Sequence, residues 1–357
     1  MTSLLQAGGA RSATELHAAR LATPAVRATP LREGILQLER PLLLHLGGRL
    51  DGVRIAWRLT GNPDGAIVAA LGGISAGRAV ADIGTSEKGW WSEVIGPGKA
   101  LDIERYQVLG IDFLGGSGAT TGPRAGQTNF PSISTYDQAE ILRHVLEHLH
   151  ASLAAIVGAS YGGMVALAFA ERHPHLVKHV IAISAADRPH PMATAWRSVQ
   201  RAMVRYAARN GDAPEGLRLA RALAMATYRS PEEFAVRFAG APARIDGRFQ
   251  FPVESYLLAR GDAYAATYVP EAFVCLSESI DLHQVDASRI RVPVTLVAIL
   301  EDQLIPISDM RSLHTRLGGP AALVELSSLY GHDAFLKEGD ALQPVFTGAL
   351  EGQGGAA

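Results

Sequence analysis

Short apolar runs that end in turn residues alternate with longer segments of helical periodicity along most of the chain. Residues 66–71 form an unbroken apolar run that meets two glycines, and residues 106–112 end at an acidic residue before a glycine-rich loop. Continuous apolar runs of this length are typical of strands buried on both faces of a sheet. The same pattern predicts further strands at 153–157, 177–184, 294–300 and 322–326.

Helices are predicted between these strands. Residues 136–150 place Ala139, Leu142, Val145 and Leu149 on one face, and a second helix is predicted at 162–172. Strands that alternate with helices indicate a mostly parallel sheet with helices on both faces. The fold class predicted is therefore α/β.

The pattern changes after about residue 186, where helical periodicity continues with little strand signal. Helices are predicted there at 196–207, 216–228, 230–238 and 254–264. We interpret residues 187–285 as a helical lid inserted between late strands, over the sheet edge where open α/β folds bind ligands. The α/β core is then expected at 35–186 and 286–357.

The first 34 residues are expected to form a flexible tail outside this core. The segment 1–31 is rich in Ala, Arg, Thr and Pro and poor in acids, and it has no long apolar stretch of a secretory signal. A transit peptide to an organelle is the alternative interpretation. The tail interpretation is favoured because terminal segments of this composition are commonly loosely ordered.

Composition and charge exclude several classes of protein. The chain has 357 residues, of which 48% are apolar and 19% charged, so it can bury a large core and is not intrinsically disordered. A net charge of −2 offers no field for nucleic acid or an anionic membrane surface. The single cysteine, Cys275, allows no intramolecular disulfide, and no apolar run spans a bilayer. We expect a soluble, cytoplasmic protein.

The motif G-x-S-x-G occurs twice, around Ser75 and around Ser160. Ser160 follows a predicted strand and precedes a helix that starts with small residues, which is the strand–turn–helix context of a nucleophile elbow. The segment after Ser75 is a poorer helix. Ser160 is therefore the predicted nucleophile, with Ser75 as the alternative.

A serine hydroxyl needs a base, and the base needs a third group to orient it. Asp302 follows the strand predicted at 294–300, and His332 follows the strand predicted at 322–326. The order Ser, Asp, His is that of the α/β-hydrolase fold. Asp302 could instead cap a helix, and eleven other histidines exist. The pattern predicts a Ser160–Asp302–His332 triad and no metal site.

Two backbone amides are predicted to form the oxyanion hole. One belongs to Tyr161, the residue after the nucleophile, and the other to Ile74 in the glycine-rich loop after an earlier strand. In the alternative interpretation, the glycines of that loop only make a turn.

Several sequence blocks between about residues 51 and 348 resemble those of the homoserine O-acyltransferases, in matching order. These blocks are Gly89-Trp90-Trp91, residues 95–102, residues 114–123, Thr227-Tyr228-Arg229-Ser230, residues 253–257 and residues 331–336. The resemblance implies a ping-pong reaction in methionine biosynthesis. In that reaction acyl-CoA, a substrate rather than a cofactor, acylates the serine, and the hydroxyl of L-homoserine then takes the acyl group.

The resemblance further implies that Arg221 and Tyr228 engage homoserine and that Asp333 accepts its ammonium. The residues agree with this, because an amino acid needs one fixed cation and one fixed anion. Arg221 and Tyr228 are seven residues apart on one predicted helix and so share a face. Asp333 is adjacent to His332. In the alternative interpretation Arg221 is solvated and Asp333 caps a helix.

The acyl group and the acceptor stay open. Many succinyl-using members of the family carry arginine two residues after the catalytic aspartate, where this chain has Leu304, so acetyl is favoured unless another arginine serves. L-Serine, one methylene shorter, is an alternative acceptor. An ester or thioester hydrolase and a non-catalytic binding module are the alternative functions. Members of the family are often dimers, so the resemblance also allows a homodimer.

Overall fold

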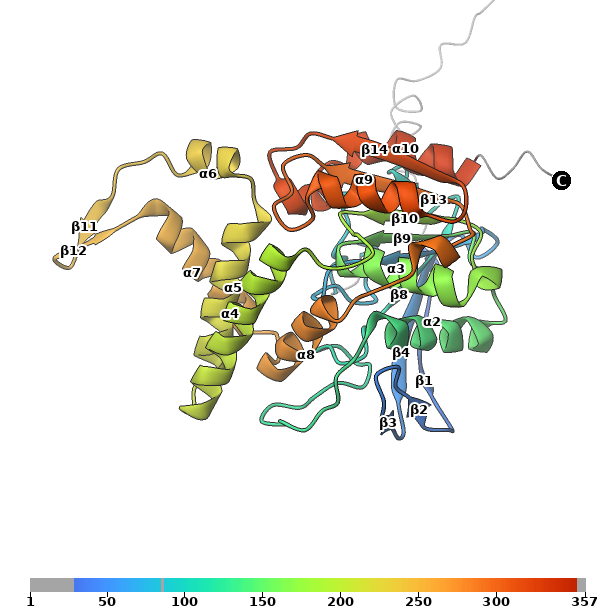
Figure 1. Ribbon diagram of the computed structural model, residues 1–357, viewed down its shortest axis with the longest axis horizontal. Coiled ribbons are helices and arrows are strands. Elements are labelled where there is room, and N and C mark those ends of the chain that lie inside the picture. Colours follow the sequence, from blue (N-terminus) through green and yellow to red (C-terminus); the bar gives the residue numbers. More distant parts are fainter. Residues whose placement is uncertain (1–28, 85–86, 352–357) are drawn as a thin grey trace, which may run out of the picture.

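A mostly parallel eight-stranded sheet forms the centre of the molecule (Figure 1). The structure is a computed structural model that describes residues 29–84 and 87–351. The strands lie in the spatial order β1 (Leu31–Gln37), β4 (Arg54–Gly61), β8 (Gln107–Ile111), β5 (Ile67–Leu71), β9 (Ala155–Ala159), β10 (Val180–Ile183), β13 (Val294–Ile299) and β14 (Ala321–Leu326).

The strands from β8 to β14 pair in parallel, whereas β4 pairs antiparallel with both β1 and β8. The six predicted strands are thus confirmed. The antiparallel edge was not predicted. The tail expected at 1–34 is wrong for residues 31–34, which pair with β4 as the start of β1, because an exposed edge strand needs few apolar residues. Residues 1–28 lie outside the described residues.

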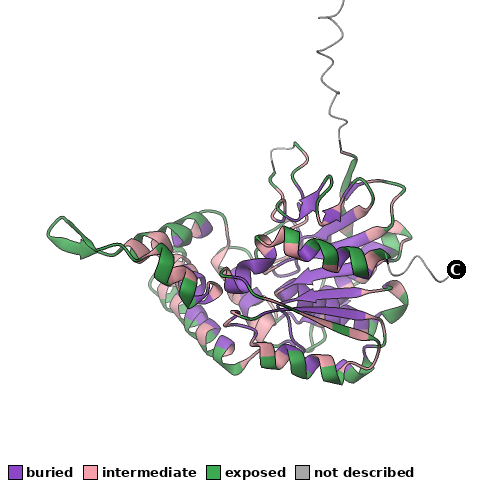
Figure 2. Ribbon diagram, turned by 90° about the horizontal axis from the view of Figure 1, so that it is seen from above, coloured by how far each residue is buried: buried purple, intermediate pink, exposed green. Residues whose placement is uncertain are grey.

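Helices cover both faces of the sheet, as the sequence predicted. One face packs against α2 (Thr135–Leu149), α3 (Tyr161–Arg172) and α9 (Ile307–Arg316), and the other against α10 (Gly339–Glu351). Successive residues of β9 alternate between the two cores, since Ile156 belongs to one and Val157 to the other. The strands between the two edge strands, β1 and β14, are accordingly buried over most of their length (Figure 2).

A helical insertion leaves the sheet at the end of β10 and returns at β13 (Figure 1). Its helices are α4 (Pro191–Arg209), α5 (Ala213–Tyr228), α6 (Pro231–Arg237), α7 (Pro252–Ala265) and α8 (Pro270–Asp281). Four of them match the predicted helices, and α8 was not predicted. A projecting hairpin of β11 (Ala243–Ile245) and β12 (Arg248–Gln250) corrects the expectation of little strand structure here (Figure 2).

The remaining elements are short. Two small pairings join β2 (Leu42–Leu43) to β3 (Arg49–Leu50) and β6 (Ile95–Gly96) to β7 (Leu101–Asp102). Single 3₁₀ turns lie at η1 (Pro174–Leu176) and η2 (Ala287–Arg289), and a longer one at η3 (Gly331–Leu336). Among the described residues, none of the helices combines the length and the apolar character that a membrane crossing requires.

Candidate active site

Ser160 lies at a sharp turn between β9 and α3. Its backbone is at φ 54° and ψ −122°, a conformation that side-chain-bearing residues rarely adopt. The flanking glycines are needed for close packing, because a Cβ at Gly158 would lie 2.3 Å from the Gly162 carbonyl oxygen, and one at Gly162 would lie 2.2 Å from the Leu71 carbonyl oxygen. The predicted strand–turn–helix context of this serine is confirmed.

The turn places Ser160 against a histidine and an aspartate from two other loops. The Ser160 Oγ lies 2.8 Å from His332 Nε2, and His332 Nδ1 lies 2.7 Å from Asp302 Oδ2. The second oxygen of Asp302 accepts the backbone N–H groups of Leu304 at 2.8 Å and Ile305 at 3.1 Å. Asp302 therefore has a fixed carboxylate plane, and the structure brings together the three side chains predicted as a triad.

The environment of His332 favours its protonated form. Burial of the imidazole opposes the charge, but the charge of Asp302 and its hydrogen bond, with a smaller contribution from Asp333, outweigh burial and raise the His332 pKa above 6.5. The imidazole is thus a stronger base than a free histidine. Its Nε2 atom, which contacts the Ser160 hydroxyl, can therefore accept the proton of that hydroxyl.

The second G-x-S-x-G serine has a different neighbour. The Ser75 hydroxyl donates a hydrogen bond to the Tyr264 hydroxyl at 3.1 Å. A neutral phenol does not activate a serine as an imidazole does, because its hydroxyl is a far weaker base. Of the two candidate nucleophiles, the geometry thus favours Ser160.

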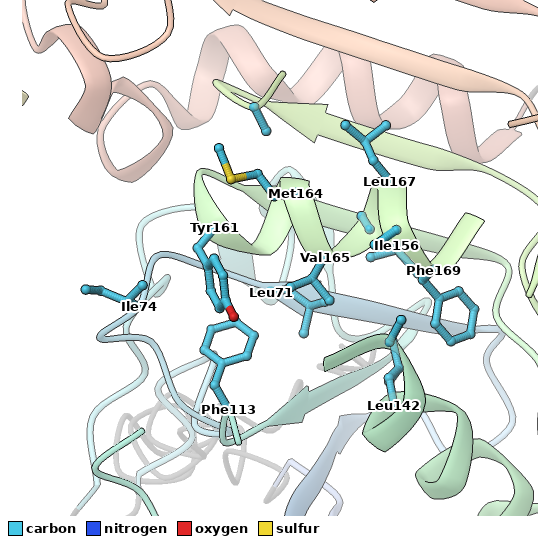
Figure 3. Close-up of a cluster of buried hydrophobic side chains, with 14 of the residues drawn as sticks. Leu71, Ile74, Phe113, Leu142, Ile156, Tyr161, Met164, Val165, Leu167 and Phe169 are labelled. Atoms are coloured by element: carbon cyan, nitrogen blue, oxygen red, sulfur yellow. The ribbon is translucent and has the colours of Figure 1, made fainter. Parts of the chain in front are cut away.

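The backbone amides of Ile74 and Tyr161 donate no hydrogen bond to any of the described residues. Ile74 lines the same cavity as Ser160. The Tyr161 side chain points away into the core, where its ring packs edge-on against Phe113 (Figure 3). Its hydroxyl there contacts Gln138 and Ser279. Only the backbone of Tyr161 is therefore available to a bound ligand.

Two tyrosines from the insertion hold the glycine-rich loop, and no sequence motif pointed to either of them. The Tyr268 hydroxyl donates to the Ile74 carbonyl oxygen at 2.7 Å, and Tyr264 accepts from Ser75. The two rings stack with centroids 4.7 Å apart. The insertion therefore fixes the position of a loop that lies nearly 200 residues earlier in the chain.

The predicted acceptor residues lie around the same histidine. Arg221 lies over the rings of Tyr228 and Tyr264, at 5.3 and 4.7 Å, so the predicted shared face of Arg221 and Tyr228 is confirmed. The Tyr228 ring centroid is 5.8 Å from that of His332. Tyr228 also lines the cavity at Ser160.

Asp333 is buried beside an arginine that sequence reasoning missed. Arg229 Nε lies 3.1 Å from Asp333 Oδ2, and Arg229 also pairs with Glu233 at 3.3 Å. Burial raises the pKa of Asp333, although Arg229, His332 and Arg221 oppose this. One guanidinium thus serves two carboxylates. The signal for Arg229 was its place in the sequence block 227–230.

A narrow cavity of about 40 Å³ lies between the core and the insertion at Ser160. Its lining includes Ile74, Met164, Leu304, Ile305 and His332 from the core, and Trp196, Arg197, Gln200, Thr227, Tyr228, Phe273, Ser277 and Ile280 from the insertion. Within the part of the chain that the structure describes, no three His, Cys, Asp or Glu side chains are grouped to hold a metal. The arrangement suits attack by a serine in a restricted space.

Comparison with known proteins places this site in context. A family model described as the alpha/beta hydrolase fold matches residues 72–339. The chain is 40% identical over 347 residues to a homoserine O-succinyltransferase of Xanthomonas campestris, covering 96% of this chain and 91% of that protein. It is 32% identical to an L-serine/homoserine O-acetyltransferase of Streptomyces lavendulae, covering 86% and 94%.

Solved structures share the same architecture. The crystal structure of esterase E22 superposes with a TM-score of 0.80 at 20% identity, covering 90% of this chain and all of that one. A homoserine O-acetyltransferase from Bacillus anthracis also gives 0.80, at 19% identity, covering 90% and 97%. At such identities the likeness concerns the fold, which accommodates both transfer and hydrolysis.

Proposed function

The chain belongs to the homoserine O-acyltransferases of the α/β-hydrolase fold, and from this premise we propose that it transfers an acyl group to the side-chain hydroxyl of L-homoserine. One observation carries the proposal: Ser160 Oγ lies 2.8 Å from His332 Nε2, with Asp302 behind the imidazole. The acyl donor in this proposal is acyl-CoA, acting as a substrate.

In the first half-reaction, Ser160 Oγ attacks the thioester carbonyl of the donor. His332 Nε2 takes the hydroxyl proton as the Oγ–C bond forms, and the imidazolium is stabilised by Asp302. The C–S bond then breaks, and the thiolate leaves with the proton from His332. The products are free CoA and an acyl ester on Ser160.

The charge that develops on the carbonyl oxygen needs hydrogen-bond donors. The amides of Tyr161 and Ile74 are the proposed donors, since neither is used elsewhere in the described residues. The N-terminal end of α3, which begins at Tyr161, adds a favourable partial positive charge. The two amides and the end of α3 are therefore in position before the oxyanion forms.

In the second half-reaction, the homoserine hydroxyl attacks the acyl ester and gives its proton to His332. We assign the acceptor carboxylate to Arg221 with Tyr228 beside it, and the ammonium to Asp333. Arg229 contacts both Asp333 and Glu233, and Arg237 also pairs with Glu233, so the ammonium assignment rests on the place of the Asp333 carboxylate next to His332. L-Serine lacks one methylene, a difference of about 1–3 kcal/mol, so it stays an alternative acceptor.

Transfer instead of hydrolysis requires that water be kept from the acyl ester. The cavity at Ser160 is small, and residues of α4, α5 and α8 line the side that faces the insertion. The insertion thus supports a transferase more than a hydrolase with an open cleft. Leu304 lines this cavity and favours acetyl as the acyl group, and relatives of both acetyl and succinyl type are known.

The deciding experiment gives the purified protein acetyl-CoA or succinyl-CoA, each with homoserine, serine or no acceptor. Thiol release and product mass are measured together. We expect an O-acyl amino acid to form at the rate of thiol release. Rapid thiol release with free carboxylic acid as the product, unaffected by either amino acid, would show a hydrolase instead.

The rate of the first half-reaction should rise with pH through the pKa of His332. Below that pKa the imidazole carries protons on both nitrogens and accepts none from Ser160, so the rate falls as the pH falls. Because the His332 pKa lies above 6.5, the midpoint of the acid limb should do so too. The measurement is single-turnover thiol release against pH, and a midpoint well below 6.5 would contradict the assignment.

Removal of one hydroxyl from the insertion should slow acylation without weakening donor binding. Tyr268→Phe deletes the hydrogen bond to the Ile74 carbonyl, which holds the loop with the proposed oxyanion donor. We expect the acylation rate to fall roughly tenfold, the usual order for one buried hydrogen bond, at unchanged KM. The matched control is Tyr256→Phe on α7. Equal rates in the two variants would show that Tyr268 does not position the loop.

A further inference from the structure

The junction between α5 and α6, residues 228–230, contacts both of the loops that carry the histidine and the aspartate of the triad. Tyr228 is the last residue of α5, and Ser230 is the N-terminal cap of α6. Asp302 and His332 follow two different strands, β13 and β14, yet their side chains meet at 2.7 Å. A contact between two separate loops depends on what holds each loop in place.

The first connection runs to the loop of the aspartate. Gln303, the residue after Asp302, donates a hydrogen bond from Nε2 to the backbone carbonyl oxygen of Arg229 at 2.7 Å. Arg229 is the C-terminal cap of α5. A side chain adjacent to the catalytic carboxylate is thus attached to the 228–230 junction.

The second connection runs to the loop of the histidine. Ser230 is buried, and its hydroxyl donates to the backbone carbonyl oxygen of Leu329 at 2.6 Å, three residues before His332. The backbones also fit closely, because a Cβ at Gly331 would lie 3.0 Å from both the Ser230 nitrogen and the Tyr228 carbonyl oxygen. The residue before the histidine therefore packs directly against the 228–230 junction.

Packing of side chains alone does not hold the histidine loop. Of residues 327–330, only Ser328 is buried, and the Leu329 side chain is 56% exposed. A loop with little buried apolar surface depends on hydrogen bonds for its position, and it opens more easily than the core does. The bond from the Ser230 hydroxyl to the Leu329 carbonyl is one of these hydrogen bonds.

We propose that Ser230 and Gln303 are positioning residues, which through the 228–230 junction hold the catalytic histidine and aspartate at hydrogen-bonding distance. This inference rests on the proposed function, in which the histidine takes the proton of the nucleophilic serine. A displacement of either loop lengthens the contact between histidine and aspartate, and a misplacement of about 1 Å can cost ~100-fold in rate. Neither side chain lines the cavity at Ser160, so both act through the triad.

The pKa of His332 provides a readout that a loss of stability alone would not change. Burial lowers this pKa, and Asp302 and Asp333 raise it, with Arg197 opposing them. Both positioning residues are uncharged, so their replacement alters the pKa mainly through the distances between the charged groups. A longer contact with Asp302 weakens the main raising influence, and the acid limb of acylation then moves to lower pH.

The test measures single-turnover thiol release against pH for Gln303→Met and Ser230→Ala, without acceptor and with whichever of acetyl-CoA and succinyl-CoA acylates wild type faster. Methionine resembles glutamine in length but has no N–H to donate. We expect each variant to acylate roughly tenfold more slowly, the order for one buried hydrogen bond, at an unchanged half-saturating donor concentration. The acid limb should lie at lower pH. Ser230→Thr, which keeps the hydroxyl, should recover most of the rate.

Ser134→Ala is the matched control, because the Ser230 hydroxyl also caps α6 by accepting the Glu233 amide. Ser134 is likewise a buried cap, of α2, and lies outside the cavity at the catalytic serine. Its replacement should lower the thermal midpoint by a few degrees and leave the acylation rate and the acid limb unchanged.

The outcomes separate this inference from the proposed function. If Gln303→Met and Ser230→Ala kept the wild-type rate, or lost rate with the acid limb in place, the positioning role would be overturned while acyl transfer stood. A rise in the KM of homoserine alone, in the full reaction, would also overturn it and assign the junction to acceptor binding. If wild type formed no acyl-enzyme, the proposed function would fail and this inference with it. Should Ser230→Ala not fold, Gln303→Met alone decides.

Discussion

Replacement of Ser160 by alanine should abolish acyl-enzyme formation and lower acyl transfer by roughly 10⁶-fold, the scale seen when a serine nucleophile is removed. The reason is direct, because Ser160 Oγ is the atom that becomes esterified and no other hydroxyl lies against His332 Nε2 in the described residues. The measurement is thiol release from acyl-CoA, together with the intact mass of the protein after incubation without acceptor.

The fold should tolerate this change. Ser160 has no side-chain cap hydrogen bond in α3, and alanine experiences the same backbone strain at φ 54° as serine does. The thermal midpoint should therefore stay within a few degrees of wild type. Ser75→Ala is the matched control, from the other G-x-S-x-G motif, and it should still form the acyl-enzyme. Acylation of the Ser160→Ala protein would refute the assigned nucleophile.

Most of the parallel part of the sheet was predictable because strands β5, β8, β9, β10 and β13 are buried on both faces, so apolar runs mark them. Strand β4 is as deeply buried yet was missed, since its sequence places Arg58 and Thr60 inside. Arg58 is accommodated there by ion pairs with Glu33 and Glu87. Ion pairs with distant segments therefore allow the charged Arg58 to lie in the core. The local sequence pattern does not indicate such pairs.

Two elements of the insertion were missed for different reasons. The hairpin of β11 and β12 is exposed throughout, so no alternation of burial exists to be read from its residues. The sequence of its turn does indicate a hairpin, because Asp-Gly is a favoured pair in tight hairpin turns. Asp246 and Gly247 both have positive φ, as such a turn requires. Helix α8 begins at Pro270 and was not predicted, although a proline is well suited to the first turn of a helix.

The candidate triad could be predicted because each member follows a strand and the chemistry demands those three residue types. Arg197, Arg229 and Tyr268 could not be predicted in the same way. Their contacts join the insertion to the core or one part of the insertion to another, and they depend on how the helices pack rather than on spacing. The residues that refine the site are thus those that only tertiary structure brings together.

Asp302→Asn should lower the acylation rate by about 10⁴-fold, and the hydrogen bonds of the loop explain why. Asp302 Oδ1 accepts the N–H groups of Leu304 and Ile305, so an asparagine would keep its carbonyl oxygen there. Its NH₂ group would then face His332 Nδ1 and donate to it. This selects the tautomer with the proton on Nε2, which cannot accept the proton of Ser160.

The same substitution should also shift the pH profile. Asp302 is the main group that raises the His332 pKa against the effect of burial, so the acid limb of the remaining activity should move to lower pH in the variant. Glu301→Gln is the control. Its carboxylate accepts from Ser327 and Ser328 and not from His332, and its rate should stay within a few-fold of wild type. If Asp302→Asn also kept its rate within about tenfold, with no shift of the acid limb, Asp302 would serve only to hold the loop.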